Sequence, residues 1–165
     1  MNLAGILVLA AVQNYGPFDI NGWELRGAVN NEGAYVCSVS IPYNSGIDLA
    51  FVRSASTFRI ALQNSDWALD EGQRYSLSLR VDNRFSQTVT AHAAGGQTLA
   101  IDYDYVPNSQ LENALIYGNI LHVTAQQADF QFALTNSSRA LPGLETCLQQ
   151  GRRNPFAAGP KQITD

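Results

Sequence analysis

The two histidines of this sequence, His92 and His122, are the first candidates for acid–base chemistry, because an unperturbed imidazole titrates near neutral pH. A Ser-His-Asp hydrolase needs a serine beside a histidine that is itself held by an acid. No G-x-S-x-G segment is present to position such a serine. His92 lies on the same face of an expected strand as Thr88 and Thr90, and His122 lies on a face of mixed polarity. We therefore expect surface or packing roles for both histidines, and no catalytic residues.

Carboxylates are the second candidates. Asp102 and Asp104 lie on one face of the segment Asp-Tyr-Asp-Tyr, where they could contribute to a calcium site, since Ca²⁺ prefers oxygen ligands. The loop spacing of an EF-hand is absent. Asp66, Asp70 and Glu71 surround a turn in the same way. Alternating acids of this kind are typical of a solvated strand face, so we expect no bound metal and no cofactor.

Aromatic side chains are the third group of candidates, here for a binding surface. Four tyrosines could line a binding surface, because tyrosine has an apolar ring with a polar tip and loses little entropy when it is ordered: Tyr43, Tyr103, Tyr105 and Tyr117. The alternative is that they serve as core and cross-strand packing.

The two cysteines, Cys37 and Cys147, are 110 residues apart and lack the close pairs and histidine partners of a zinc site. In an oxidising compartment we expect them to form a disulfide that joins an early strand to a late helix. The alternative is two buried thiols that do not meet.

Charge excludes one class of function. The formal net charge is −4 and charged residues make up 15% of the chain, below the roughly 25% of average domains. No basic stripe is present to replace the counterions of a nucleic acid, so we expect no nucleic-acid partner.

The fold class follows from hydrophobic periodicity. In the segment that ends at Asp82, Tyr75, Leu77, Leu79 and Val81 alternate with polar residues, as in a half-buried strand. At least eight short segments of this type occur at regular spacing, beginning with an edge strand at residues 23–26. They predict an all-β fold, either an antiparallel β-sandwich or a flattened barrel.

Two helices are expected beside these strands. Pro107 at a first helical position and Gly118 after the last predict a short helix near residues 107–117. Apolar residues at helical spacing predict a C-terminal amphipathic helix packed on the sheet: Ala140, Leu141, Leu144, Cys147 and Leu148. Pro142 could delay its start, and Gly151 suits the residue after its end.

The length of 165 residues fits one domain. Residues 3–12 form an apolar run too short to span a bilayer, and we expect no transmembrane segment. We interpret residues 1–13 as a signal-peptide remnant or as a first strand, residues 14–156 as a single β-sandwich domain, and residues 157–165 as a tail.

Several segments resemble small exported proteins of alphaproteobacteria, near the invasion-associated locus B family. They are Trp23, Cys37, residues 64–82, residues 132–147 and Asn154-Pro155-Phe156. The resemblance implies an exported all-β protein without known catalytic residues, and it supplies no active site.

The expected function is therefore that of a non-enzymatic periplasmic or secreted protein that binds a protein or cell-envelope component. Three alternatives stay open: a secreted hydrolase with an unrecognised site, an inhibitor or immunity protein against a toxin or cell-wall hydrolase, and a structural subunit of a virion or surface assembly. The sequence gives no oligomeric state.

Overall fold

One antiparallel sheet of ten strands forms most of the molecule. The computed structural model describes residues 14–153. The strands are β1 (Tyr15–Ile20), β2 (Trp23–Val29), β3 (Tyr35–Pro42), β4 (Asp48–Arg53), β5 (Thr57–Gln63), β6 (Arg74–Val81), β7 (Phe85–Gly95), β8 (Thr98–Asp104), β9 (Ile120–Ala125) and β10 (Ala128–Ala133). Their order across the sheet is β1-β2-β3-β4-β5-β8-β7-β6-β9-β10.

The register places apolar side chains in continuous rows on one face of this sheet. One row crosses five neighbouring strands and is buried throughout: Leu25, Val39, Phe51, Ile60 and Ile101. The opposite face is more exposed and more polar, because strands β2 to β6 alternate between buried and exposed side chains in the way the sequence predicts. The predicted alternation in β6 is confirmed, with Leu77, Leu79 and Val81 buried and Ser76 and Ser78 exposed.

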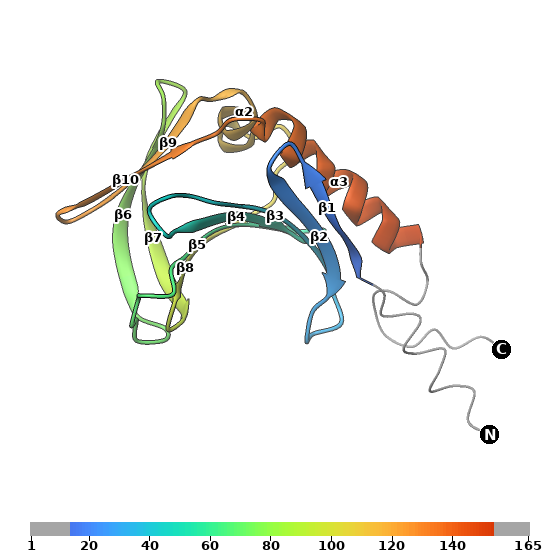
Figure 1. Cartoon of the computed structure of the whole chain (residues 1–165), viewed down its shortest axis with the longest axis horizontal. Helices are drawn as coiled ribbons and strands as arrows, with labels where there is room; N and C mark the ends of the chain where they lie inside the picture. The colour runs from blue at the N-terminus through green and yellow to red at the C-terminus, as the bar shows by residue number, and fades with distance from the viewer. Residues whose placement is uncertain (1–13, 154–165) are drawn as a thin grey trace.

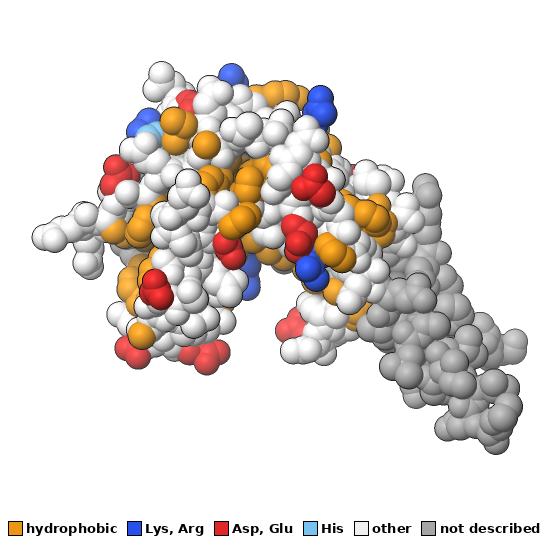
Figure 2. Space-filling view, viewed as in Figure 1, with side chains coloured by type: hydrophobic (Ala, Val, Ile, Leu, Met, Phe, Trp, Pro, Cys, Tyr) orange, Lys and Arg blue, Asp and Glu red, His pale blue; other side chains and the backbone are white. Residues whose placement is uncertain are grey.

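The sheet bends until its two ends approach each other (Figure 1). The ring of Phe132 on β10 packs edge-on against Tyr43, which follows β3, at 5.1 Å between centroids. The indole Nε1 of Trp23 on β2 donates to the Thr135 carbonyl oxygen, just after β10. In the space-filling view an open notch separates the lower end of the arm formed by β6 and β7 from the turn between β2 and β3 (Figures 1 and 2).

The mainly β fold is confirmed, but all ten strands belong to one open sheet and not to the two stacked sheets of a sandwich. The physical reason is that twist accumulates over many strands, so a long sheet can curl and cover its own apolar face.

The helix α3 (Ser137–Arg153) covers the apolar face at the β1–β4 end of the sheet. The predicted apolar stripe of α3 is buried, and its Cys147 forms a disulfide with Cys37 on β3, with a Cα–Cα separation of 6.1 Å. Both the C-terminal helix and the disulfide are therefore confirmed. The carbonyl oxygen of Arg26 lies 3.8 Å from Cys147 Sγ. Because a disulfide sulfur carries no hydrogen, this is a packing contact.

The bounds of α3 differ from the prediction. It begins before Pro142 and runs through it, and it continues past Gly151. Pro142 lies close to the start of the helix, and burial of the apolar stripe and the disulfide compensate for the hydrogen bond that it cannot make. Gly151 is buried against the ring of Tyr35, where a Cβ atom would overlap that ring.

The short helix α2 (Gln110–Tyr117) packs against α3. It starts three residues later than predicted, because Ser109 and not the residue before Pro107 is the N-cap, and the Ser109 side chain accepts from the Glu112 backbone N–H. The buried hydroxyl of Ser137 donates to the Leu115 carbonyl oxygen at 2.7 Å, which joins the start of α3 to α2.

The first edge strand is β1, and not the strand predicted at residues 23–26, which is the second strand β2. The predictions for residues 1–13 and for residues 154–165 fall outside the described part of the chain.

Candidate binding groove

A groove lies where the two helices meet the ends of strands β4, β5 and β8. It consists of two adjoining cavities of about 720 Å³ and 240 Å³, and Phe58, Tyr105 and Glu112 line both. The larger cavity is bounded by the β4–β5 turn, α2 and α3, and the smaller by β7, β8 and the start of α2. We call the two cavities together the α2 groove.

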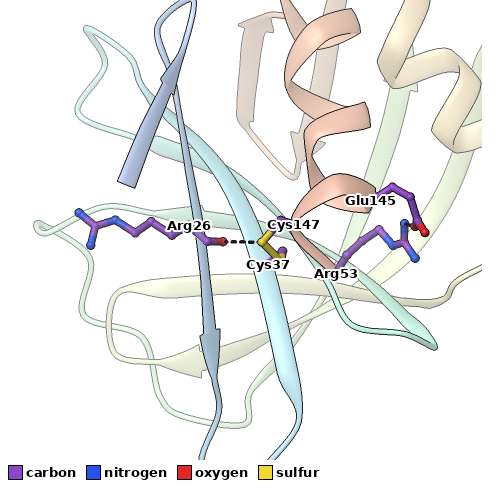
Figure 3. The surroundings of a disulfide bond; sticks show 5 residues. All are labelled: Arg26, Cys37, Arg53, Glu145 and Cys147. Carbon is purple, nitrogen blue, oxygen red and sulfur yellow. Dashed lines mark hydrogen bonds and ion pairs between the residues drawn. A yellow bond between two sulfur atoms is a disulfide. The ribbon is translucent and has the colours of Figure 1, made fainter. Parts of the chain in front are cut away.

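Arg53 lies under the larger cavity and is the one buried charged residue in the described core, with 5% of its surface exposed. Arg53 points to the same, buried side of β4 as Leu49 and Phe51. It lies opposite Cys37 on the neighbouring strand β3. Its Nη1 donates to Glu145 Oε2 on α3 at 2.9 Å. Figure 3 shows how the disulfide holds α3 so that Glu145 reaches Arg53.

Aromatic rings line the floor of the groove. The guanidinium carbon of Arg53 lies 3.4 Å from the ring centroid of Tyr105, a cation–π contact. Phe85 and Tyr103 line the smaller cavity, and the Tyr103 hydroxyl lies 3.3 Å from Gln87 Oε1. Burial raises the pKa of Tyr103 to about 12. Burial is also the largest cause that raises the pKa of Tyr105, whereas the charge of Arg53 lowers it.

Glu112 lines both cavities. Ser109 and Glu112 have the spacing of a capping box, in which the glutamate side chain would accept from the N-cap backbone N–H. Here the Ser109 N–H donates to the Val106 carbonyl oxygen instead. The Glu112 carboxylate lines both cavities, and after burial its interaction with Tyr105 helps to raise the pKa of that phenol.

Two polar atoms of the groove have no hydrogen-bond partner within the described residues, although both are buried: Arg53 Nε and Glu112 Oε2. Leaving a buried donor or acceptor unpaired costs about 1–3 kcal/mol. One is a donor and the other an acceptor, so a group that supplies both an acceptor and a donor would satisfy both.

The structure brings together two of the four tyrosines proposed as a binding surface. Tyr103 and Tyr105 line the α2 groove. Tyr43 packs on Phe132, and its hydroxyl donates to the Ala133 carbonyl oxygen at 2.7 Å, while burial raises its pKa to about 12. Tyr117 is 63% exposed and lines neither cavity of the groove.

The two histidines lie on the polar face of the sheet, away from the groove. His92 Nε2 is 3.7 Å from Asp102 Oδ2, and Asp102 is also held by Arg59 through two N–H donors, at 2.6 and 3.0 Å. Asp104, on the same face as Asp102, lies at the rim of the smaller cavity.

Between residues 14 and 153 no three His, Cys, Asp or Glu side chains gather in a way that could hold a metal ion. Within the same range no helix combines the length and the apolar character needed to cross a membrane.

Sequence reasoning missed Arg53, Glu112 and Glu145. The signal for Arg53 was present, since a charged residue occupies a position that the alternation of β4 assigns to the core. Glu112 follows Ser109 at capping-box spacing, a pattern that indicates a role at the start of a helix and does not indicate a groove. Glu145 flanks the apolar stripe of α3, where a charged residue is common.

Comparisons of the chain with protein-family models, with curated proteins and with solved structures found no match.

Proposed function

We propose that this protein is a non-catalytic binding protein of an oxidising compartment, periplasmic or secreted, and that the α2 groove receives a segment of a protein partner. The single observation that carries the proposal is Arg53, a buried cation with an unpartnered Nε beneath an open groove of about 720 Å³. The disulfide between Cys37 and Cys147 supports the compartment, because structural disulfides persist where the surroundings are oxidising.

The chemistry of the groove favours binding over catalysis. Its charged side chains are one arginine and three carboxylates, and neither histidine contributes to it. Arg53 is held by Glu145 and by the Tyr105 ring, so it is fixed as a hydrogen-bond donor. A segment of polypeptide supplies what the groove lacks, since every backbone amide offers both a carbonyl acceptor and an N–H donor.

A displayed library of random 12-residue peptides tests the proposal with the whole oxidised chain as bait. The affinity of each selected peptide is then measured for two variants that each introduce a tryptophan. Ala55→Trp fills the mouth of the larger cavity from an exposed turn position, and Ser76→Trp places the same ring on the polar face of β6.

We expect a class of peptides that bind Ala55→Trp at least tenfold more weakly than the parent protein and bind Ser76→Trp equally well. Peptides that bind all three proteins alike, or a selection that yields no binder, would overturn the proposed site.

A further inference from the structure

We infer that the α2 groove selects a basic peptide segment, in which a lysine or arginine side chain is flanked by apolar residues. This inference rests on the proposed function and adds the chemistry of the partner. The charges of the groove, its unpartnered polar atoms and its aromatic floor all favour such a segment.

The charges of the groove do not balance. Its lining carries one cation, Arg53, and three carboxylates, those of Asp104, Glu112 and Glu145. Arg53 and Glu145 form an ion pair with each other. Among the side chains of residues 14–151 neither Asp104 nor Glu112 has an ion-pair partner, so the remaining negative charge lies around the smaller cavity and its junction with the larger one.

The unpartnered atoms specify more than charge. Glu112 Oε2 lacks a donor, and an ammonium or guanidinium group supplies several. Arg53 Nε lacks an acceptor, and a backbone carbonyl oxygen of the same segment supplies one. Both atoms are buried, so we expect the Glu112 side chain and the residues that cover these atoms to shift when the segment binds, while Arg53 keeps its contacts with Glu145 and Tyr105.

The floor of the groove suits the rest of such a side chain. Tyr105 already stacks on a guanidinium, that of Arg53, which demonstrates that this ring binds a cation on one face. Phe58, Phe85 and Tyr103 line the smaller cavity, whose 240 Å³ suits one side chain with an alkyl stem. A flanking apolar residue fits the larger cavity against Leu141 and Leu144.

An anionic ligand fits less well. A phosphate or carboxylate that approached Arg53 would meet the like charge of Glu112 and Glu145, which line the same cavity. Repulsion between like charges in a partly dehydrated site opposes such binding.

The peptides that depend on the groove in the Ala55→Trp comparison provide the test. In each of them the basic residue is replaced by norleucine, which keeps the alkyl stem and removes the charge. The dissociation constant is then measured by fluorescence anisotropy with the parent protein and with Asp104→Asn, Glu112→Gln and the control Asp66→Asn. Asp66 is exposed and lies outside the groove lining.

We expect lysine or arginine in most groove-dependent peptides and a rise of about fivefold in the dissociation constant on replacement by norleucine, as for a partly screened ion pair. In Glu112→Gln or Asp104→Asn the same replacement should change little, and Asp66→Asn should behave as the parent does. The two single variants test the charge separately, so loss of fold in one leaves the other decisive.

Groove-dependent peptides that are neutral or acidic would overturn the basic specificity and leave the proposed function standing. Absence of any groove-dependent peptide would overturn both.

Discussion

Removal of the disulfide tests how α3 is held on the sheet. Replacing Cys37 and Cys147 by alanine opens a loop of 110 residues. In the chain-entropy model a cross-link over such a loop stabilises the folded state by about 5 kcal/mol. That is a large share of the roughly 5–15 kcal/mol by which a domain is stable, and both cysteines are fully buried, so the loss of their packing adds to it.

The assay is guanidinium unfolding followed by tryptophan fluorescence, since Trp23 is buried beside Phe51 in the core. We expect the double alanine variant and the reduced parent protein to unfold at similar, much lower denaturant concentrations than the oxidised parent. Reductant should leave the variant unchanged, which controls for effects of the reductant itself. A variant within 1 kcal/mol of the oxidised parent would refute the reasoning, and would mean that apolar contacts alone hold α3.

Three further predictions concern the groove and its supports. Glu145→Gln should lower the free energy of unfolding by about 1–2 kcal/mol, because it leaves the buried Arg53 cation less compensated, and in an Arg53→Met background it should cost less; equal costs in the two backgrounds, measured by thermal unfolding, would contradict the pair. Gly151→Ala should lower the free energy of unfolding by about 1–3 kcal/mol in denaturant titrations, although alanine favours helices, because the added Cβ atom would overlap the ring of Tyr35. The control Gly96→Ala should be neutral, because its added Cβ atom would lie 3.8 Å from the nearest atom. In the folded protein the pKa of Tyr103 is about 12, above the ordinary 10.0, so the neutral phenol contributes its full stability below pH 10 and this contribution is lost as the pH rises toward 12. Between pH 9 and pH 11.5 the free energy of unfolding should therefore fall less for Tyr103→Phe than for the parent protein, and an equal fall would contradict the shift.

Periodicity predicted which residues face the core, because alternation in a strand depends on local geometry alone. The inward-facing residues of β6, Leu77, Leu79 and Val81, are buried as expected. The disulfide could be predicted because its two cysteines lie on an inward strand phase and on the apolar stripe of α3.

Strand order could not be predicted in the same way. Besides β4, β5 pairs with β8, whose residue Ile101 lies opposite Ile60 and 41 residues later in the sequence. Alternation states which face of a strand is apolar, but it does not distinguish among partners with equally apolar faces. The single curled sheet and the sandwich therefore share one sequence pattern.

The groove was hidden for a related reason. Tyr103 and Tyr43 look alike in sequence, and only the tertiary fold places one in the groove and seals the other against Phe132. Arg53 was the residue whose pattern conflicted with its type. Conflicts between local pattern and residue type are where functional sites are expected.

Arg53 also allows a test of whether a buried charge stabilises the fold or serves binding. A buried ion pair replaced by apolar residues of similar volume is often as stable as before, or more stable, because charges lose hydration when buried. Methionine at position 53 would extend the buried apolar residues of β4, so we expect Arg53→Met to fold with about the stability of the parent protein. If Arg53→Met keeps the stability of the parent and loses the groove-dependent peptides, the buried charge serves binding. If Arg53→Met unfolds, the ion pair between Arg53 and Glu145 is needed to hold α3 against β4, and the buried charge has a structural role.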